Sequence, residues 1–308
     1  MKLSTRELQY PAARGVRLVA LNLLDEAGES AARLVASVGA DNLHDFRVAV
    51  RRLRSWIRVL RDRLPDAGKS DRKRLKQCAK ATNEGRDLEV QIAWLEKSSS
   101  RFNLRRKRGT QWLAGELKAR QPDMEKLVTV AIEKNLTPAR ASLSSRLETY
   151  MQPVRPDPPG METLACAIAD RLLPITRALT ASLDRITDLA DEREIHQARI
   201  RTKRVRYLLE PAASSAKGGS KAIAKLRSLQ DSLGNVHDLQ LLAHVIEQMV
   251  ERSAGLNTPR TDLLSVARHL QHDVEKSFKP VRENWLDGKH AAFSDLIEGI
   301  ASRLMKFG

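Results

Sequence analysis

Four arginines recur at helical spacing within one short segment of the chain. They are Arg47, Arg51, Arg54 and Arg58, and His44 precedes them at the same spacing. At about 100° per residue on a helix, these side chains fall on one stripe. Like charges three or four residues apart repel one another, so an isolated fold gains nothing from such a row. A polyanion would neutralise it, and the planar guanidinium group can bind two phosphate oxygens at once.

A second basic stripe lies in the other half of the chain. Its members are His196, Arg199, Lys203 and Arg206, followed by Tyr207. The segment 44–54 aligns with 196–206, and Arg86-Asp87-Leu88 aligns with His237-Asp238-Leu239. Because two motifs keep their order and nearly their spacing, we predict a tandem duplication of a helical unit.

Lysines extend the candidate site beyond the two stripes. Lys73, Lys76 and Lys80 share one face of the segment after the first stripe, and Lys221 and Lys225 form a weaker row after the second. The stripes and these lysines together are our candidate residues for binding phosphate.

Other residues near the stripes have more than one interpretation. His44 and His196 could each donate a hydrogen bond to phosphate or hold a neighbouring aspartate, and the sequence does not choose between these roles. Arg52 and Arg204 lie off the stripes, and we expect them to pair with Asp87 and Asp238.

The elements that position these residues are predicted to be helices throughout. Apolar residues recur three and four apart, and no segment shows sustained alternation of β-branched residues. Beside the first stripe, Phe46, Ala49, Val50, Leu53, Trp56, Ile57 and Leu60 form an apolar sector that must face the core. Ala198, Val205, Leu208 and Leu209 do the same beside the second. The helical segments are expected at 14–38, 43–64, 70–97, 106–134, 161–190, 195–213, 220–232, 237–252, 261–278 and 290–306.

A proline-rich segment divides the chain almost in half. Four prolines lie within seven residues, from Pro153 to Pro159, and such a segment cannot be helical. We therefore expect an all-α fold with one repeat in residues 1–152, a linker at 153–160 and a second repeat in residues 161–308.

The composition narrows the partners that such a protein could have. The 308 residues include 54 Lys and Arg against 38 Asp and Glu, a net charge of +16 that points to a polyanionic partner. Aromatic residues are only 4% of the chain, which argues against a surface that stacks nucleic-acid bases. Two cysteines cannot build a disulfide framework or a zinc cluster, and no apolar run is long enough to span a membrane. We therefore expect a cytoplasmic protein.

Motifs for catalysis or cofactor binding are missing from the sequence. It contains no GxxxxGK[ST] or GxGxxG loop, no cysteine–histidine nucleophile arrangement and no carboxylate cluster for a metal. The prediction is therefore a site without a metal, a cofactor or a catalytic residue.

The double motif resembles that of the CHAD domain, the conserved-histidine α-helical domain. The similar residues are His44, Arg47, Val48 and Arg51 to Ser55, then Arg86-Asp87-Leu88, and the second set from His196 to Tyr207 with His237-Asp238-Leu239. The resemblance covers residues 10 to 305 approximately. It implies two helical bundles related by a pseudo-twofold axis around a basic central groove or pore that binds inorganic polyphosphate. Some family members are fused to other domains or associate with polyphosphate or polyester storage granules, and this chain resembles the stand-alone form.

The function expected from the sequence is non-catalytic binding of inorganic polyphosphate. Two alternatives stay open at this point. One is a phosphohydrolase that acts on polyphosphate or a nucleotide, and the other is a basic protein that binds nucleic acid without sequence specificity.

Overall fold

Helices form all of the regular secondary structure in the described part of the chain, as the apolar periodicity predicts. The computed structural model describes residues 2–37, 39–65, 67–149, 161–252 and 260–307. Within these ranges the extended backbone pairs only at an isolated bridge between Pro11 and Thr163. The protein is therefore all-α. The expected linker at 153–160 lies outside the described residues.

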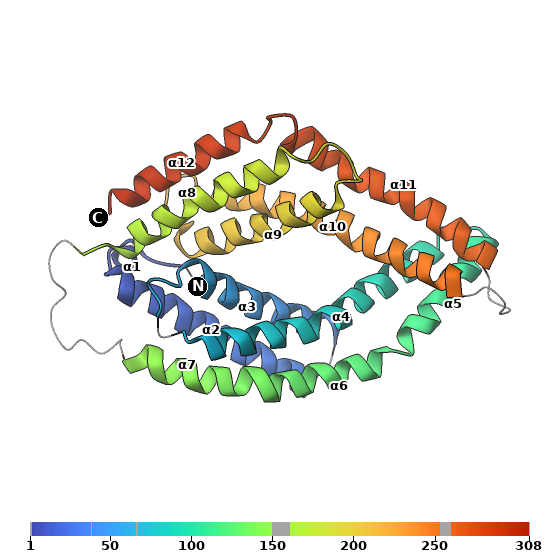
Figure 1. Ribbon diagram of the computed structural model, residues 1–308, viewed down its shortest axis with the longest axis horizontal. Coiled ribbons are helices and arrows are strands. Elements are labelled where there is room, and N and C mark those ends of the chain that lie inside the picture. Colours follow the sequence, from blue (N-terminus) through green and yellow to red (C-terminus); the bar gives the residue numbers. More distant parts are fainter. Residues whose placement is uncertain (1, 38, 66, 150–160, 253–259, 308) are drawn as a thin grey trace.

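Figure 1 shows the helices running along the long axis of the molecule, with α2, α3, α4, α6 and α7 in one half and α8 to α12 in the other. The helix α5 packs against both α4 and α11 and so joins the two halves. In chain order the helices are α1 (Thr5–Leu8), α2 (Ala12–Ala36), α3 (Ala40–Val59), α4 (Lys69–Ser99), α5 (Leu104–Lys118), α6 (Gln121–Ala131), the π-helix η1 (Ile132–Leu136), α7 (Thr137–Thr149), α8 (Leu164–Leu183), α9 (Glu192–Leu209), the 3₁₀-helix η2 (Glu210–Ala212), α10 (Gly219–Arg252), α11 (Arg260–Trp285) and α12 (Ala291–Met305).

Two helix boundaries differ from the expected pattern. The segments 220–232 and 237–252 form one continuous helix, α10, because Leu233 and Val236 between them are buried and keep the apolar face unbroken. The expected segment 106–134 is instead divided between α5, α6 and η1. Pro122 lies at the start of α6, where its missing N–H is not needed by the helix.

The apolar sector of α3 fixes the direction in which its basic stripe points. The predicted inward residues from Phe46 to Leu60 are all buried, as are the four predicted on α9. Trp56 is the largest of them, and its indole Nε1 donates a hydrogen bond of 3.0 Å to the backbone carbonyl of Val16 on α2. Because this side of α3 is anchored against α2, the arginines on the adjoining side must face away from it.

An ion-pair network joins the chain after α3 to the start of α8. Arg63 bonds to Glu162 at 2.6 Å and to Asp170 at 3.0 Å, while Arg171 bonds to Asp62 at 2.5 Å. These ion pairs, and the packing of α2 on α8 and of α3 on α9, fix the position of one half of the molecule against the other.

No helix in the described ranges is long and apolar enough to cross a membrane.

Replacing Trp56 tests how far the anchor of α3 stabilises the fold. We expect Trp56→Ala to lower the free energy of unfolding by about 3–5 kcal/mol, because it empties a fully buried site. Trp56→Phe keeps most of the volume but loses the bond to Val16, and should cost about 1–2 kcal/mol. Urea unfolding followed by circular dichroism measures both.

Trp112 on α5 is the matched control, because it is only partly buried. Trp112→Phe should cost less than Trp56→Phe. Equal losses at the two positions would show that the bond to Val16 contributes nothing to stability.

Candidate functional site

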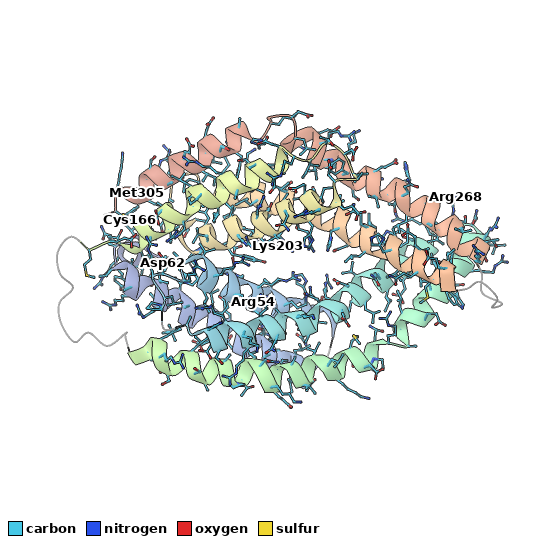
Figure 2. The ribbon with its side chains drawn as sticks, in the orientation of Figure 1. Arg54, Asp62, Cys166, Lys203, Arg268 and Met305 are labelled. Atoms are coloured by element: carbon cyan, nitrogen blue, oxygen red, sulfur yellow. The ribbon has the colours of Figure 1, made fainter. Side chains whose placement is uncertain are left out.

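A cavity of about 390 Å³ lies between α3, α4, α9 and α10, and most of the predicted stripe residues line it. Figure 2 labels Arg54 on α3 and Lys203 on α9, which face the same space from opposite halves of the molecule. Seven Arg and Lys side chains line this cavity against one carboxylate. They are Arg47, Arg51, Arg54, Arg58, Arg199, Lys203 and Arg204, with Asp87 as the carboxylate.

Arg47 is the most enclosed member of the α3 stripe, with only 5% of its surface exposed. Its Nη1 donates hydrogen bonds to the backbone carbonyls of Thr82 and Asn83 on α4. Burial, together with the nearby charge of Arg51, lowers the pKa of Arg47 to about 9. Arg47 therefore both fixes α4 against α3 and carries positive charge to the floor of the cavity.

Arg199 and Lys203 contribute basic side chains to the cavity from α9. The Arg199 guanidinium lies 3.5 Å from the Asp238 carboxylate, and its pKa is lowered by burial. Lys203 has no carboxylate within ion-pair distance in the described chain. Burial and then the positive charges of Arg199 and Arg51 lower the pKa of Lys203 to about 6. The amine is therefore largely uncharged at neutral pH until an anion enters.

Two histidines meet beside these cations. The rings of His196 and His237 lie 5.0 Å apart between centroids, and both line the cavity. Burial lowers the pKa of His237 to about 3, with further contributions from Arg199 and His196. The pKa of His196 is lowered for the same reason, by burial first and then by Arg199 and Lys203. Both rings are neutral near pH 7 and can each donate one hydrogen bond.

Asp87 is the one carboxylate among the residues that line this cavity. Burial raises the pKa of its carboxyl group, although Arg47 acts in the opposite direction. The cavity thus holds seven basic side chains and one carboxyl group, and an anion is the ligand that this lining favours.

A second basic cavity continues from the first. It has a volume of about 230 Å³ and shares Arg54 and Arg58 with the larger one. Arg61, Arg72 and Lys76 complete its charged lining. Lys76, one of the lysines predicted to bind phosphate, therefore lines this second cavity.

Several predicted residues lie outside both cavities. His44, Lys73, Lys80, Lys221 and Lys225 are exposed and line neither. Arg206 lies 3.4 Å from the Glu210 carboxylate, and its guanidinium stacks over the Tyr207 ring at 4.8 Å. Tyr207 is buried and does line the larger cavity.

The expected pairs of Arg52 and Arg204 are wrong. Arg52 bonds to Glu26 at 2.6 Å and to Glu210 at 3.2 Å, because it projects from α3 toward α2 and η2. Arg204 lines the cavity, and Asp238 instead lies within ion-pair distance of Arg199. The partners were misassigned because sequence spacing gives the face of a helix but not which neighbouring helix covers it.

Sequence reasoning missed Arg204 and His237 in the larger cavity, and Arg61 and Arg72 in the smaller one. The alignment of the two sequence motifs could have identified His237, which aligns with Arg86. Both motifs contribute a residue to the cavity lining, Asp87 from α4 and His237 from α10. Arg204 gave no such signal, because it lies off the predicted stripe.

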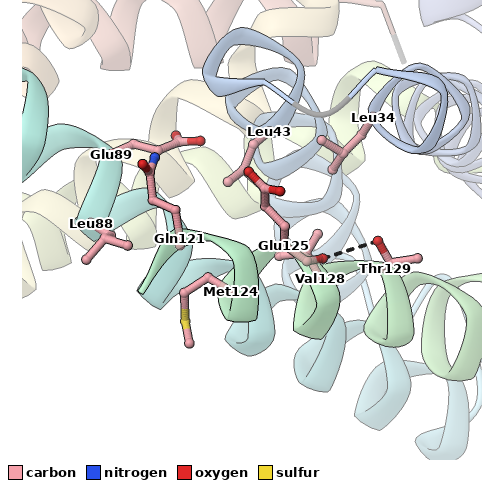
Figure 3. A pocket seen from close by; sticks show the side chains of 10 residues that line it. Leu34, Leu43, Leu88, Glu89, Gln121, Met124, Glu125, Val128 and Thr129 are labelled. Atoms are coloured by element: carbon pink, nitrogen blue, oxygen red, sulfur yellow. Dashed lines mark hydrogen bonds between the residues drawn. The ribbon is translucent and has the colours of Figure 1, made fainter. Parts of the chain in front are cut away.

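A separate pocket lies between α2, α3, α4 and α6, lined mainly by apolar side chains with Glu89 and Glu125 among them (Figure 3). Its volume of about 30 Å³ is enough for a water molecule or two. It is too small to hold a substrate.

Within the described ranges, no three His, Cys, Asp or Glu side chains are grouped so that they could hold a metal ion.

Two solved structures have a similar fold. The crystal structure of the CHAD domain from the plant Ricinus communis matches with a TM-score of 0.68 at 16% identity, over 95% of this chain and 94% of that one. PptA from Streptomyces chartreusis matches with a TM-score of 0.62, also at 16% identity, over 89% of this chain and 99% of that one. At such identities the likeness concerns the fold. No curated protein matches the chain.

The sequence profile of the CHAD domain matches residues 20–247. This range contains α3, α4 and α9 and nearly all of α10, the helices that surround the basic cavity. Since the match extends over well more than half of the chain, and the fold agrees with that of a solved CHAD domain, this protein belongs to the CHAD domain family.

Proposed function

We propose that this protein binds inorganic polyphosphate in the basic cavity between α3 and α9 and does not turn it over. The observation that carries the proposal is the group of seven Arg and Lys side chains that line one cavity with a single carboxyl group. Bringing these cations together costs free energy in the unliganded protein, because burial and mutual repulsion both disfavour their charged forms. A bound polyanion offsets the cost of burying these charges and the cost of their mutual repulsion.

The length of the basic surface favours a chain of phosphates over a single one. The α3 stripe from Arg47 to Arg58 extends about 16 Å at 1.5 Å per residue. It continues into the smaller cavity at Arg61, Arg72 and Lys76. Each guanidinium group can bind two oxygens of the same phosphate, so successive arginines match successive phosphates.

The duplicated architecture is part of the same proposal. The helices α2, α3 and α4 are followed later by α8, α9 and α10 in the same order, and each middle helix carries a basic stripe. We assign residues 1–152 and 161–308 to two repeats that together make one CHAD domain, with a pseudo-twofold axis passing near the cavity.

Removing one charge from each side of the cavity tests the site. The double substitution Arg51→Ala with Lys203→Ala should weaken binding of long-chain polyphosphate by about 10- to 100-fold, since each charged hydrogen bond contributes about 1.5 kcal/mol or more. Calorimetric titration at physiological salt measures the affinity.

The matched control removes the same charge from exposed positions, by Arg33→Ala with Arg193→Ala. This variant should bind almost as the parent does. Equal weakening in the two double variants would mean that only overall charge matters, and would contradict a dedicated site.

The smaller cavity should matter for long chains only. Arg61→Ala with Lys76→Ala should weaken long-chain polyphosphate severalfold and leave inorganic triphosphate nearly unchanged, because a short chain does not reach both cavities. Competition between the two ligands measures this. A similar loss for triphosphate would show that the two cavities do not bind one chain in succession.

Binding should take up protons, and Lys203 should be the main source of the effect. Its pKa is about 6 in the free protein, and the negative charge of the ligand should raise it toward the ordinary value of a lysine. Close to one proton should therefore enter per site near pH 7.5, and affinity should fall as the pH rises above about 6. Titrations in two buffers with different ionisation enthalpies give the number of protons.

Lys203→Arg separates this effect from the loss of a contact. An arginine stays charged in both states, so the variant should bind polyphosphate but take up much less than one proton. Unchanged proton uptake in this variant would assign the effect to another group, such as His196 or His237, which line the same cavity.

The two alternative functions have distinct results in the same assays. A phosphohydrolase would release orthophosphate from polyphosphate or a nucleotide in the presence of added metal. A nonspecific nucleic-acid binder would let excess duplex DNA displace polyphosphate, whereas we expect polyphosphate to displace DNA. Cytoplasmic location and association with storage granules stay predictions of the sequence.

A further inference from the structure

Another polar cavity, of about 340 Å³, lies between α4, α10 and α11. It is separate from the proposed polyphosphate site and contains none of the stripe residues. Asp238 connects this cavity to the basic cavity. It lines this cavity, and its carboxylate lies within ion-pair distance of Arg199, which lines the basic cavity. We call it the α11 cavity.

Three cations at the α11 cavity have no acidic partner. Lys97 and Arg101 come from the end of α4 and the turn after it, and Lys276 comes from α11. All three are exposed, and none lies within ion-pair distance of a carboxylate in the described part of the chain. They provide charge for an anionic group at the rim.

The α11 cavity differs from the basic cavity in the number of its carboxylates. Asp238 and Asp273 both line it, and Asp273 lies 3.8 Å from the His269 ring. A phosphate polymer offers only acceptor oxygens, so two carboxylates would repel it. A ligand with hydroxyl or amino donors, as well as an anionic group, suits this lining.

The inner part of the cavity combines an aromatic ring with an open amide. Gln91 is only 7% exposed, yet its side chain has no hydrogen-bond partner among the described residues. Trp94 lies one helical turn further along α4 and is partly buried, with a T-shaped contact to Phe102 at 6.3 Å. The Gln91 amide is not among the buried side-chain atoms that lack a hydrogen-bond partner, so it is open to the cavity that Gln91 lines. A flat heterocycle resting on the indole can bond to this amide at its edge.

We propose that the α11 cavity binds a nucleoside phosphate. The base lies against Trp94 with its edge on Gln91, and the phosphates contact Lys97, Arg101 and Lys276. The ribose hydroxyls and base amino group donate to Asp238 and Asp273. A volume of about 340 Å³ is in the range of small-molecule sites in proteins.

The test uses the full chain carrying Arg51→Ala with Lys203→Ala, which removes charge from the polyphosphate site and leaves the α11 cavity intact. ATP is titrated at physiological salt. Trp94→Leu should weaken ATP binding by about tenfold or more, because stacking on an aromatic ring is lost. Trp94→Phe keeps a ring and should bind within about threefold of its parent.

A charge-matched pair of variants gives an independent measurement. Lys276→Ala should weaken ATP severalfold. Lys279→Ala removes the same charge from the same helix, but Lys279 pairs with Glu283 at 3.6 Å and does not line the cavity, so its variant should bind as the parent does. Both positions are exposed, so neither substitution threatens the fold.

Inorganic triphosphate distinguishes a nucleotide site from a further phosphate site. ATP should bind about tenfold more tightly than triphosphate, and Trp94→Leu should remove that difference. Equal affinity for the two ligands, or ATP binding that ignores both Trp94→Leu and Lys276→Ala, would overturn the proposal. Because polyphosphate binding by the chain without these substitutions is measured separately, failure here leaves the function proposed for the first cavity untouched.

Discussion

The repulsion between cations gathered at the interface of α3 and α9 is the constraint on which this structure depends. Arg47, Arg199 and Lys203 are largely enclosed, and burial lowers the pKa of each. Such a group is held together only because the opposite faces of the same helices are firmly packed. On α3 that packing includes Trp56 and its bond to Val16, and on α9 it includes Val205, Leu208 and Leu209. The apolar core thus supplies the free energy that holds these basic side chains close together before a ligand binds.

The arrangement of carboxylates shows how the fold keeps its cations available. Arg52 and Arg206, which do not line the cavity, both lie within ion-pair distance of Glu210. Inside the cavity, Asp87 is the one carboxylate, and burial favours its protonated form. Arg47 bonds instead to the neutral backbone carbonyls of Thr82 and Asn83, which orient the side chain without cancelling its charge. Arg47 is therefore fixed in direction while its charge remains available to a ligand.

Positions that align between the two proposed repeats have different surroundings in the structure. Asp87 lines the basic cavity, whereas Asp238, its counterpart in the repeat, lies at the α11 cavity beside Arg199. Arg86 pairs with Glu89 at 3.4 Å, while His237 at the matching place faces the basic cavity. In the proposed duplication, such a difference between the repeats would retain one shared site and add a second cavity of different chemistry on one side only.

The sequence alone determined the all-α class, the inward faces of α3 and α9 and most of the basic residues that line the larger cavity. This was possible because the apolar and the basic side chains of 44–58 occupy adjoining sectors of one helix. When the apolar side chains are buried in the core, the direction of the basic side chains is fixed as well. What only the tertiary structure decided is which elements meet. Arg52 lies off the basic stripe as expected, but its partners are Glu26 and Glu210 and not the expected Asp87. Arg204 lines the cavity, although its position on the helix predicted that it would face elsewhere. The α11 cavity, too, depends on where α11 crosses α4 and α10. Helical periodicity is local and can be read from spacing, whereas contacts between distant segments depend on how whole helices pack.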